Sequence, residues 1–547
     1  MPVILRTAPT LHTAGPSDYW LAVTGTSVPY QDNDKILPQL AERLEACFDR
    51  TRAIWWELGA RLGALPTSEI AHTPTCAPYN CDLGLMMAWS LLVEELAAED
   101  ADVLVLCDDP WLFRQLATLP GVEAGKAPTM RPYLFRGWLR GFLARIKYAV
   151  RAAKSAMDTK ASKANHKPSE TDSVLVVYGH PASKANGFDA YFGDLMKDLP
   201  GVRRLLHTDC GPVFANRLAA DKRTASLHAW GRPMEAIALI VAKWAPPEEA
   251  LKGPWYWLLK RAVVRENATA APASNLWQQR CQARWLADVR PRVVAWPFEN
   301  HPWERQFVRD SRAAGAATIG YQHAVIGPHQ FNPAPQSNWD GFNSYPDRVL
   351  CSGPAYRDQL EDWGVPETRL GVAGAFRVQP FDQDLYDKEG PVFVALSAVR
   401  AITREMMEAV KLAEKPGRVF LIKAHPLYPM DVEETESVRR TSKTLPEQDR
   451  VSAIFYGTGT SGLEGLFSGA PTFRLLSSKQ VAVNVLPTGI DATAVTVTGL
   501  RAALDHAHEA ENAGRKLPFE TVYTPADMEI WRKALDADSA KSALQAP

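Results

Sequence analysis

The sequence predicts an α/β protein in which two domains of parallel β-sheet face a central cleft. The chain has 547 residues, which is more than a single hydrophobic core usually supports. Short β-branched and apolar runs alternate with longer helical patterns, as in parallel βαβ units. Polar clusters follow several of these runs, and in open α/β sheets such strand ends line the ligand crevice.

Eight short apolar runs are expected to form strands. They lie at residues 103–106, 174–178, 293–296, 318–321, 392–395, 419–423, 453–456 and 471–475. A new strand–turn–helix series begins at Tyr345, so we place the domain boundary between residues 340 and 341. A polar segment poor in aromatic residues, 155–172, is expected to be a flexible linker inside the N-terminal domain.

The composition excludes several functional classes. Lysine plus arginine (61) nearly balances aspartate plus glutamate (62), so the net charge of -1 gives no global attraction to nucleic acid. The seven cysteines lack paired metal-ligand spacing, and a reducing cytoplasm fits them best. The sequence has neither a run of about 18 apolar residues nor a signal-peptide pattern. We therefore expect a cytoplasmic protein without a membrane-spanning segment.

Residues 131–154 are expected to form a basic amphipathic helix. Apolar side chains occupy one half of its helical wheel (Leu134, Phe135, Trp138, Leu139, Phe142, Leu143, Ile146, Val150), and basic side chains occupy the other (Arg136, Arg140, Lys147, Arg151, Lys154). Such a helix suits the headgroup region of an anionic membrane, and the alternative is a core-packed helix with a solvated basic face. Gly137 and Gly141 lower the helix propensity and also indicate close helix packing.

Two motifs in the C-terminal half predict an anion-binding site. The first is Lys423-Ala-His425-Pro426, which follows an apolar strand. Lys423 supplies a compact positive charge there, and His425 can donate a hydrogen bond to a phosphate. A single histidine at a strand end is more often structural, so the prediction depends on the next strand.

That strand ends in the second motif, Tyr456-Gly-Thr458-Gly-Thr460-Ser461-Gly, which leads into a predicted helix containing Glu464. A glycine-rich turn at a helix N-terminus offers backbone N–H groups, hydroxyls and the positive end of the helix dipole to an anion. The alternative is simple capping of the helix by Thr460 or Ser461. Capping needs one hydroxyl and no glycine, so phosphate binding is the favoured interpretation.

With these motifs, residues 345–498 resemble the donor domain of GT-B type glycosyltransferases of bacterial surface-carbohydrate biosynthesis. The motifs are similar to those of bacterial sialyltransferases and Kdo transferases, which use CMP-activated sugars. The resemblance implies a GT-B-like fold of two Rossmann-like domains, with an acceptor-side domain at 1–340 and a nucleotide-sugar-binding domain at 341–547. It further implies that His425, Thr460 and Ser461 hold the CMP phosphate and cytidine, and that Glu464 binds the ribose.

The general base is expected on the N-terminal side. In the sialyltransferase pattern an acidic motif carries the base, and only Trp339-Asp340-Gly341-Phe342 is similar to that motif here. Glu299 and Glu304 compete with Asp340 for this role, and His323 is a neighbour of Glu299 or an alternative to it. Glu299 is the favoured base. Glu304 either binds the acceptor or stabilises the first turn of its own helix, and a buried structural role is the alternative for His323.

Two further polar pairs have other interpretations. Asp108-Asp109 suits Mg²⁺ on a nucleotide, but Asp109-Pro110 before an apolar run is more typical of an N-cap. The family resemblance implies no metal and no cofactor beyond the donor substrate. His180-Pro181 follows another strand and is a weaker candidate than His425 for lining the cleft.

The sequence therefore predicts a nucleotide-sugar-dependent glycosyltransferase in the cytoplasm, peripheral to the inner face of the membrane. The expected reaction moves a nonulosonic acid or Kdo from a CMP-sugar onto a surface glycan, a lipid-linked intermediate or a protein. The alternatives are a UDP-sugar or CDP-glycerol dependent transferase of the same architecture and a non-catalytic glycan-assembly protein. A sugar-nucleotide epimerase is a less favoured alternative, because the basic aromatic helix would have no function in such an enzyme. Sequence does not choose the sugar, because one pocket architecture serves many donors.

Overall fold

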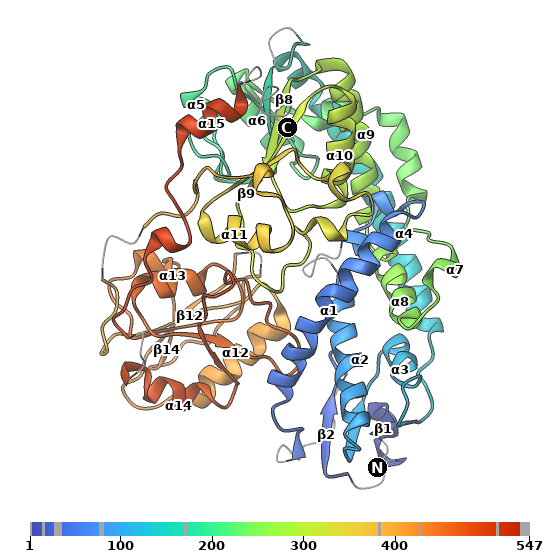
Figure 1. Ribbon diagram of the computed structural model, residues 1–547, viewed down its shortest axis with the longest axis vertical. Helices are drawn as coiled ribbons and strands as arrows, with labels where there is room; N and C mark the ends of the chain where they lie inside the picture. Colours follow the sequence, from blue (N-terminus) through green and yellow to red (C-terminus); the bar gives the residue numbers. More distant parts are fainter. Residues whose placement is uncertain are drawn as a thin grey trace.

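The computed structural model describes residues 3–13, 17–26, 35–75, 81–168, 172–380, 384–426, 428–509 and 513–536. The described strands form three sheets, and every pairing between them is parallel. Figure 1 shows the first sheet at the bottom of the molecule, the second at the top and the third at the lower left. All-parallel sheets need helical crossovers, which explains the alternation of apolar runs and helical patterns in the sequence.

The first sheet has four strands in the order β2-β3-β1-β4. Its strands are β1 (Val3–Arg6), β2 (Tyr19–Ala22), β3 (Val103–Leu106) and β4 (Val122–Ala124). The helices of this region are α1 (Leu40–Gly63), α2 (Leu83–Ala98) and α3 (Pro110–Leu116). Apolar side chains of these elements, including Trp55 and Trp89, share one buried core.

The second sheet has seven strands in the order β11-β10-β9-β8-β5-β6-β7. Its strands are β5 (Ser173–Val177), β6 (Arg203–Leu206), β7 (Thr224–Ser226), β8 (Val293–Pro297), β9 (Ala317–Gln322), β10 (Arg348–Cys351) and β11 (Leu370–Val372). The helices of this part of the chain are α4 (Arg131–Asp158), α5 (Leu195–Asp198), α6 (Pro212–Leu218), α7 (Glu248–Leu251), α8 (Tyr256–Asn267), α9 (Ala271–Val289), α10 (Pro302–Ala313) and α11 (Pro354–Asp362). Strands β8 and β9 lie near its centre and are fully buried, as their apolar sequences predict.

The third sheet has six strands in the order β14-β13-β12-β15-β16-β17. Its strands are β12 (Val392–Ala395), β13 (Phe420–Lys423), β14 (Val438–Arg440), β15 (Ala453–Tyr456), β16 (Thr472–Leu475) and β17 (Thr493–Val495). Helices α12 (Arg400–Ala413), α13 (Ser461–Ser468) and α14 (Leu500–Asp505) connect them. The two larger sheets confirm the predicted class, an α/β protein with two Rossmann-like domains, and the four-stranded sheet is an additional unit.

The boundary between the two Rossmann-like domains differs from the one expected at residue 340. Strands β10 and β11 lie beyond it, but β10 pairs with β9 in the second sheet. The last helix, α15 (Met528–Leu535), also returns to this sheet, where Trp531 packs against Phe192 and Tyr321. Sheet membership therefore changes between Val372 and Val392. A strand's sequence shows that it is buried but not which sheet it joins, and this explains the difference.

The expected flexible linker at 155–172 is corrected by the structure in its described part. Helix α4 continues to Asp158, and a 3-10 helix, η5 (Lys160–Asn165), follows it. Ser155, Thr159 and His166 are buried, and the His166 ring contacts the carbonyl oxygen of Arg204 at 3.1 Å. Small polar residues allow this close packing, and the same residues made the segment look like a linker. Residues 169–171 lie outside the described residues.

Candidate functional site

The loop that follows β8 is shaped by the buried carboxylate of Glu304. This carboxylate accepts hydrogen bonds from the backbone N–H groups of Glu299 (3.0 Å), Asn300 (3.0 Å) and His301 (3.2 Å), and from the Trp296 indole (2.8 Å). Asn300 has a φ of 58°, a left-handed conformation that costs energy in a residue other than glycine. Glu304 stabilises this loop from the first turn of α10, so its observed role is to position Glu299 and His301.

Glu299 carries its carboxylate between two histidines. The Nε2 atom of His301 lies 2.7 Å from one carboxylate oxygen, and the Nε2 atom of His323 lies 3.5 Å from the other. His323 follows β9, the neighbour of β8 in the sheet, so the sheet itself brings the three side chains together. The Glu299 side chain is 35% exposed, whereas those of His301 and His323 are 14% and 5% exposed. Glu299 is therefore the most accessible of the three side chains.

The three groups shift one another's ionisation. Burial opposes the ionisation of Glu299, but hydrogen bonds and charge from His301 and His323 outweigh burial and lower its pKa. Burial disfavours a charged His301, but the Glu299 carboxylate outweighs it and raises the pKa of His301. Burial raises the pKa of Glu304 to about 7, helped by the nearby charge of Glu299. The result is an ionised Glu299 next to a histidine that readily holds a proton.

A cation lies beside this cluster. The guanidinium of Arg377 is 3.4 Å from the Nδ1 atom of His323 and stacks over the Tyr191 ring at 5.3 Å. Tyr191 packs edge-on against both His323 and His180, and the pKa of His180 is lowered by burial and by the charge of Arg377. Neither Arg377 nor Tyr191 was among the predicted site residues, because neither directly follows a predicted strand.

The second part of the site is a cavity of about 220 Å³ at the carboxyl ends of β12, β13 and β15. It brings together all seven residues that the sequence predicts for nucleotide binding: Lys423, His425, Pro426, Thr458, Thr460, Ser461 and Glu464. Parallel strands place their carboxyl ends at one edge of a sheet, where ligands of α/β proteins bind. Phe393 and Leu445 add apolar walls to the cavity.

The glycine-rich turn at this cavity carries three hydroxyls, and those of Thr458 and Thr460 contact Ser397 (3.1 Å between the hydroxyl oxygens) and Glu464. Thr460 is the N-cap of α13, and within the described residues its side chain caps no backbone N–H group of the helix. This observation disfavours simple capping by Thr460, the alternative raised by the sequence. Gly459 has a φ of 115°, and a Cβ at Gly462 would lie 2.5 Å from the Tyr456 ring, so both positions require glycine.

The charged and polar walls of the cavity suit a nucleotide. Lys423, the last residue of β13, donates a hydrogen bond from its ammonium group to the carbonyl oxygen of Ser442. Burial lowers the pKa of His425, so its imidazole is neutral at pH 7 and has an N–H group to donate. Burial also raises the pKa of Glu464, partly offset by a hydrogen bond from the Thr460 hydroxyl.

Two observations connect the cavity to the Glu299 cluster. Tyr523 lies near both Glu464 and Arg377, whose charges act on its hydroxyl, although burial is the main cause of its raised pKa. A second cavity of about 290 Å³ shares Thr458 with the first, and a third of about 330 Å³ shares Asp82 and Arg265 with the second. The third cavity reaches His72, whose ring is 5.7 Å from that of His301.

Two predicted carboxylates have structural partners elsewhere. Asp340 is paired with Arg309 at 3.0 Å, accepts a hydrogen bond from the Ser344 hydroxyl, and has a side chain only 7% exposed. These contacts make Asp340 a poor candidate for the base. Asp109 caps α3 by accepting hydrogen bonds from the N–H groups of Trp111 and Leu112, both at 3.0 Å, which confirms the predicted N-cap.

The fold and the site define a two-domain α/β protein with an anion-type pocket on one sheet and a carboxylate–histidine cluster on the other. No protein-family model and no curated protein matches the chain. Among solved structures, the calicheamicin glycosyltransferase CalG4 is 13% identical, with 69% of this chain and 100% of that chain covered and a TM-score of 0.42.

Two other solved structures are similar at the same level. The lipopolysaccharide outer core galactosyltransferase WaaB is 8% identical over 67% of this chain and 99% of that chain, with a TM-score of 0.38. UDP-GlcNAc 2-epimerase from Neisseria meningitidis, bound to UDP-GlcNAc, is 11% identical over 68% and 98%, also with a TM-score of 0.38. Similarity this distant decides no activity, so the function has to be inferred from the residues of the site.

Proposed function

We propose that the protein is a glycosyltransferase that uses a nucleotide sugar. The observation that carries this proposal is the pairing of two chemically different sites in one molecule. The cavity at α13 offers hydroxyls, a helix N-terminus and two basic side chains, whereas the β8–β9 edge offers an ionised carboxylate with two histidines. Glycosyl transfer needs both, because a phosphate has to leave while a hydroxyl loses its proton.

In this proposal the donor nucleotide binds in the α13 cavity. Its phosphate lies at the first turn of α13, where the Thr460 and Ser461 hydroxyls and the helix dipole stabilise the negative charge that builds up as the sugar departs. His425 donates a hydrogen bond to the same phosphate, and Lys423 contributes charge at longer range. Glu464 binds the ribose. We expect the nucleotide to be CMP, because the His-Pro and Thr-Ser motifs resemble those of CMP-sugar enzymes.

The acceptor hydroxyl is activated at the Glu299 cluster. Glu299 is the most exposed of the three side chains and receives the proton first. Its lowered pKa makes it a weak base alone, but His301 accepts the proton across the 2.7 Å hydrogen bond. Glu299 and His301 titrate as one coupled pair, and the imidazole of His301 is the group that stores the proton. The acceptor oxygen then forms its bond to the anomeric carbon, the bond from that carbon to the phosphate oxygen breaks, and the nucleotide leaves.

The direct test is a transfer and hydrolysis assay with purified protein and a panel of donors: CMP-sialic acid, CMP-Kdo, UDP-GlcNAc, UDP-galactose and CDP-glycerol. We expect release of CMP from one of the CMP-sugars by wild-type protein, and none above background by Glu299→Gln. Turnover of a UDP-sugar or of CDP-glycerol instead would overturn the assignment of CMP as the donor nucleotide. The proposal that the protein is a transferase would still hold. Equal nucleotide release by wild type and Glu299→Gln would contradict the assigned base.

A further inference from the structure

Helix α4 packs on the protein through its small residues. A Cβ at Gly141 would lie 1.9 Å from the carbonyl oxygen of Asn267 at the end of α8, and one at Gly137 would lie 3.4 Å from the Val264 side chain. Ala152 and Ser155, in the C-terminal half of α4, are 0% and 1% exposed. The close approach confirms the predicted packing role of the two glycines. In the first half of α4, several large side chains nonetheless remain exposed.

These large side chains form an exposed apolar surface together with η9 (Pro233–Val241), a 3-10 helix that lies alongside α4. We call it the α4–η9 surface. Its main members, with their exposed fractions, are Phe135 (62%), Trp138 (59%), Leu139 (39%) and Leu143 (55%) on α4, and Ile237 (62%) and Val241 (75%) on η9. The rings of Phe135, Trp138 and Phe142 stack in series, with centroids 6.3 and 5.7 Å apart. Exposed patches of this kind mark an interaction site.

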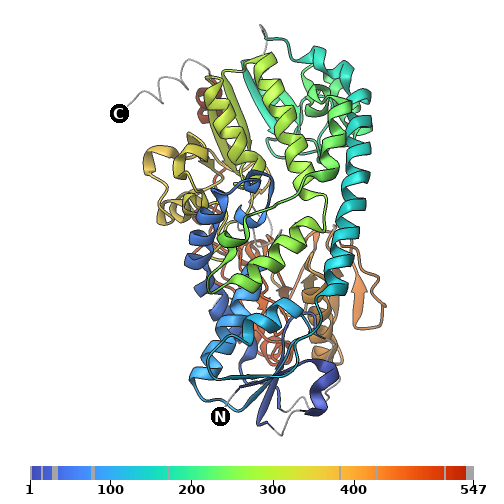
Figure 2. The same cartoon turned by 90° about the vertical axis from the view of Figure 1, so that its right-hand side faces the viewer.

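The surface is built to stay in place without a partner. Arg145, which is buried, donates hydrogen bonds to the carbonyl oxygens of Ile240 in η9 (3.0 Å) and Asn267 in α8 (2.8 Å). On the helical wheel, Arg145 lies on the same side of α4 as Trp138 and Phe142. Because Arg145 binds η9, η9 extends the apolar half of the exposed face and not its basic half. Figure 2 shows α4 as a long helix running along one edge of the molecule.

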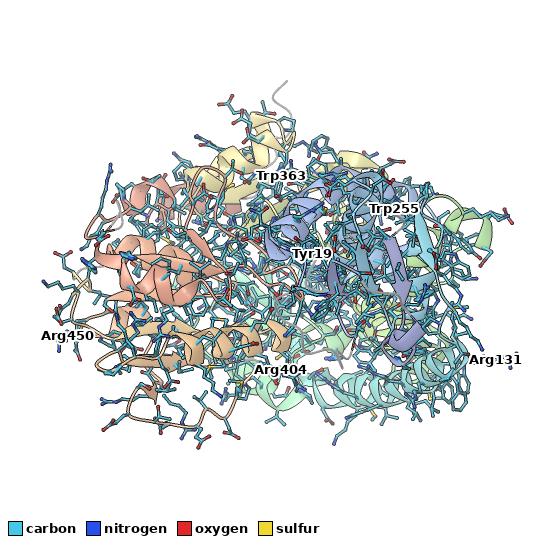
Figure 3. All side chains as sticks on the ribbon, turned by 90° about the horizontal axis from the view of Figure 1, so that it is seen from below. Tyr19, Arg131, Trp255, Trp363, Arg404 and Arg450 are labelled. Atoms are coloured by element: carbon cyan, nitrogen blue, oxygen red, sulfur yellow. The ribbon has the colours of Figure 1, made fainter. Side chains whose placement is uncertain are left out.

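A row of basic residues borders the apolar half. Arg136, Arg140, Lys147 and Lys154 are all exposed, and within the described part of the chain none of them pairs with a carboxylate. Asp158 is the only acidic residue from Arg131 to the end of the helix. Figure 3 shows Arg131, at the first turn of α4, at one edge of the molecule, and Arg450 at the opposite edge. The free basic charge selects an occupant with negative charge.

We propose that the α4–η9 surface docks the protein onto an anionic lipid bilayer. The apolar half enters the region between headgroups and acyl chains, where tryptophan is favoured, and the basic row meets the acidic headgroups. Helix α4 lies on the bilayer and does not cross it, because among the described residues no helix is long and apolar enough to do so. With 28 residues, α4 gives a contact about 42 Å long. The proposal does not depend on the proposed function.

Docking would also orient the site. Arg151, in the second half of α4, donates a hydrogen bond of 2.8 Å to the carbonyl oxygen of Asp209, whose carboxylate oxygen lies 3.2 Å from the Nδ1 atom of His207. His207 and Asp209 follow β6 at the same sheet edge as the Glu299 cluster. A bilayer on the outer side of α4 therefore lies next to the acceptor edge of the sheet, which suits an acceptor held in the membrane.

The test is co-sedimentation of the full chain with vesicles, without any donor. One set of vesicles is phosphatidylcholine alone and the other is rich in phosphatidylglycerol. We expect binding to the anionic vesicles at low salt and its loss at high salt. Phe135→Ser/Trp138→Ser and Arg136→Glu/Arg140→Glu/Lys147→Glu should each reduce binding about tenfold or more. All of these side chains are exposed, so circular dichroism should show an unchanged fold.

Two matched controls have the same kind of change elsewhere. Val213→Ser removes an apolar side chain that is 86% exposed on α6, and Lys388→Glu/Arg439→Glu/Arg450→Glu reverses three exposed charges in the third-sheet domain. Both controls should bind like wild type. Equal binding to neutral and anionic vesicles, or α4 variants that bind like wild type, would overturn the proposal. So would a dimer in vesicle-free solution that Phe135→Ser/Trp138→Ser abolishes, because a second copy would then be the occupant.

Discussion

The imidazole of His301 lies 2.7 Å from the carboxylate of Glu299, and the two residues are fixed in one loop by the buried carboxylate of Glu304. This geometry couples their ionisation in opposite directions, lowering the pKa of Glu299 and raising that of His301. A carboxylate that hands its proton to a neighbouring histidine works only when that histidine is neutral. The pair therefore links the proposed chemistry to pH.

The rate of transfer should rise with pH through the raised pKa of His301. Below that pKa His301 is protonated and cannot take the proton from Glu299, and above it the pair is ready to act. In the His301→Gln variant the rate should fall about 100-fold, and this acid limb should move to lower pH because only the carboxylate then titrates. The measurement is a pH profile of kcat/KM for both proteins. An unmoved acid limb in His301→Gln would assign it to another group.

Replacing Glu304 should destabilise the fold as well as the site. In Glu304→Gln an amide NH₂ group faces backbone N–H donors, so buried donors lose their acceptor. We expect a loss of about 2 to 4 kcal/mol in the free energy of unfolding, measured by urea titration. A matched control is Glu447→Gln, which removes an exposed capping-box carboxylate at Thr444 and should cost clearly less stability than Glu304→Gln. Equal losses in the two variants would contradict the positioning role of Glu304.

The hydroxyl of Ser461 should matter for nucleotide binding and not for stability. Because the structure assigns the N-cap position to Thr460, Ser461→Ala should change the free energy of unfolding by less than about 0.5 kcal/mol. Nucleotide affinity should fall about tenfold, which corresponds to about 1.4 kcal/mol. Asp527→Ala is the opposite control, since Asp527 does cap α15, and it should cost about 1 kcal/mol of stability with no change in affinity. A Ser461→Ala variant that loses stability and keeps its affinity would indicate a structural hydroxyl.

Gly141→Ala should disrupt the packing of α4 against the end of α8. The new methyl group would lie 1.9 Å from the carbonyl oxygen of Asn267, so either helix α4 or the end of α8 has to move. Overpacking of this kind costs about 1 to 3 kcal/mol. Gly201→Ala is the control, because a Cβ there meets nothing within 4 Å. Thermal unfolding of the two variants measures the difference, and equal midpoints would show that α4 is not held at Gly141.

The sequence allowed much of the C-terminal site to be predicted and less of the N-terminal one. The pocket at α13 is built from two short motifs at neighbouring strand ends, so all its predicted residues meet in one cavity. His301 was not among the predicted site residues, because nothing in the sequence shows that the left-handed conformation of Asn300 brings the His301 ring to Glu299. Arg377 reaches His323 across 54 positions of the chain, a contact that local patterns do not contain.

The same reasoning explains the two errors at the level of the fold. The strand–turn–helix series expected from Tyr345 begins with β10, but hydrogen-bonding partners lie outside a strand's own sequence, so this strand was assigned to the wrong sheet. Strand β11 was not among the predicted strands. The segment at 155–168 looked like a linker because serine, alanine and lysine are common in linkers, whereas here the small residues pack tightly under η8 (Leu227–Trp230) and β7.

The most direct test of the proposed function is titration calorimetry of the purified protein with CMP, CDP, UMP, UDP and GDP, repeated with His425→Ala. We expect preferential binding of CMP, weakened about tenfold or more in His425→Ala because a charge-assisted hydrogen bond to the phosphate is lost. Glu299→Gln should bind CMP like wild type, since Glu299 belongs to the acceptor side. Binding of none of the five nucleotides, or CMP binding that His425→Ala leaves unchanged, would contradict the assignment of the α13 cavity as the donor site.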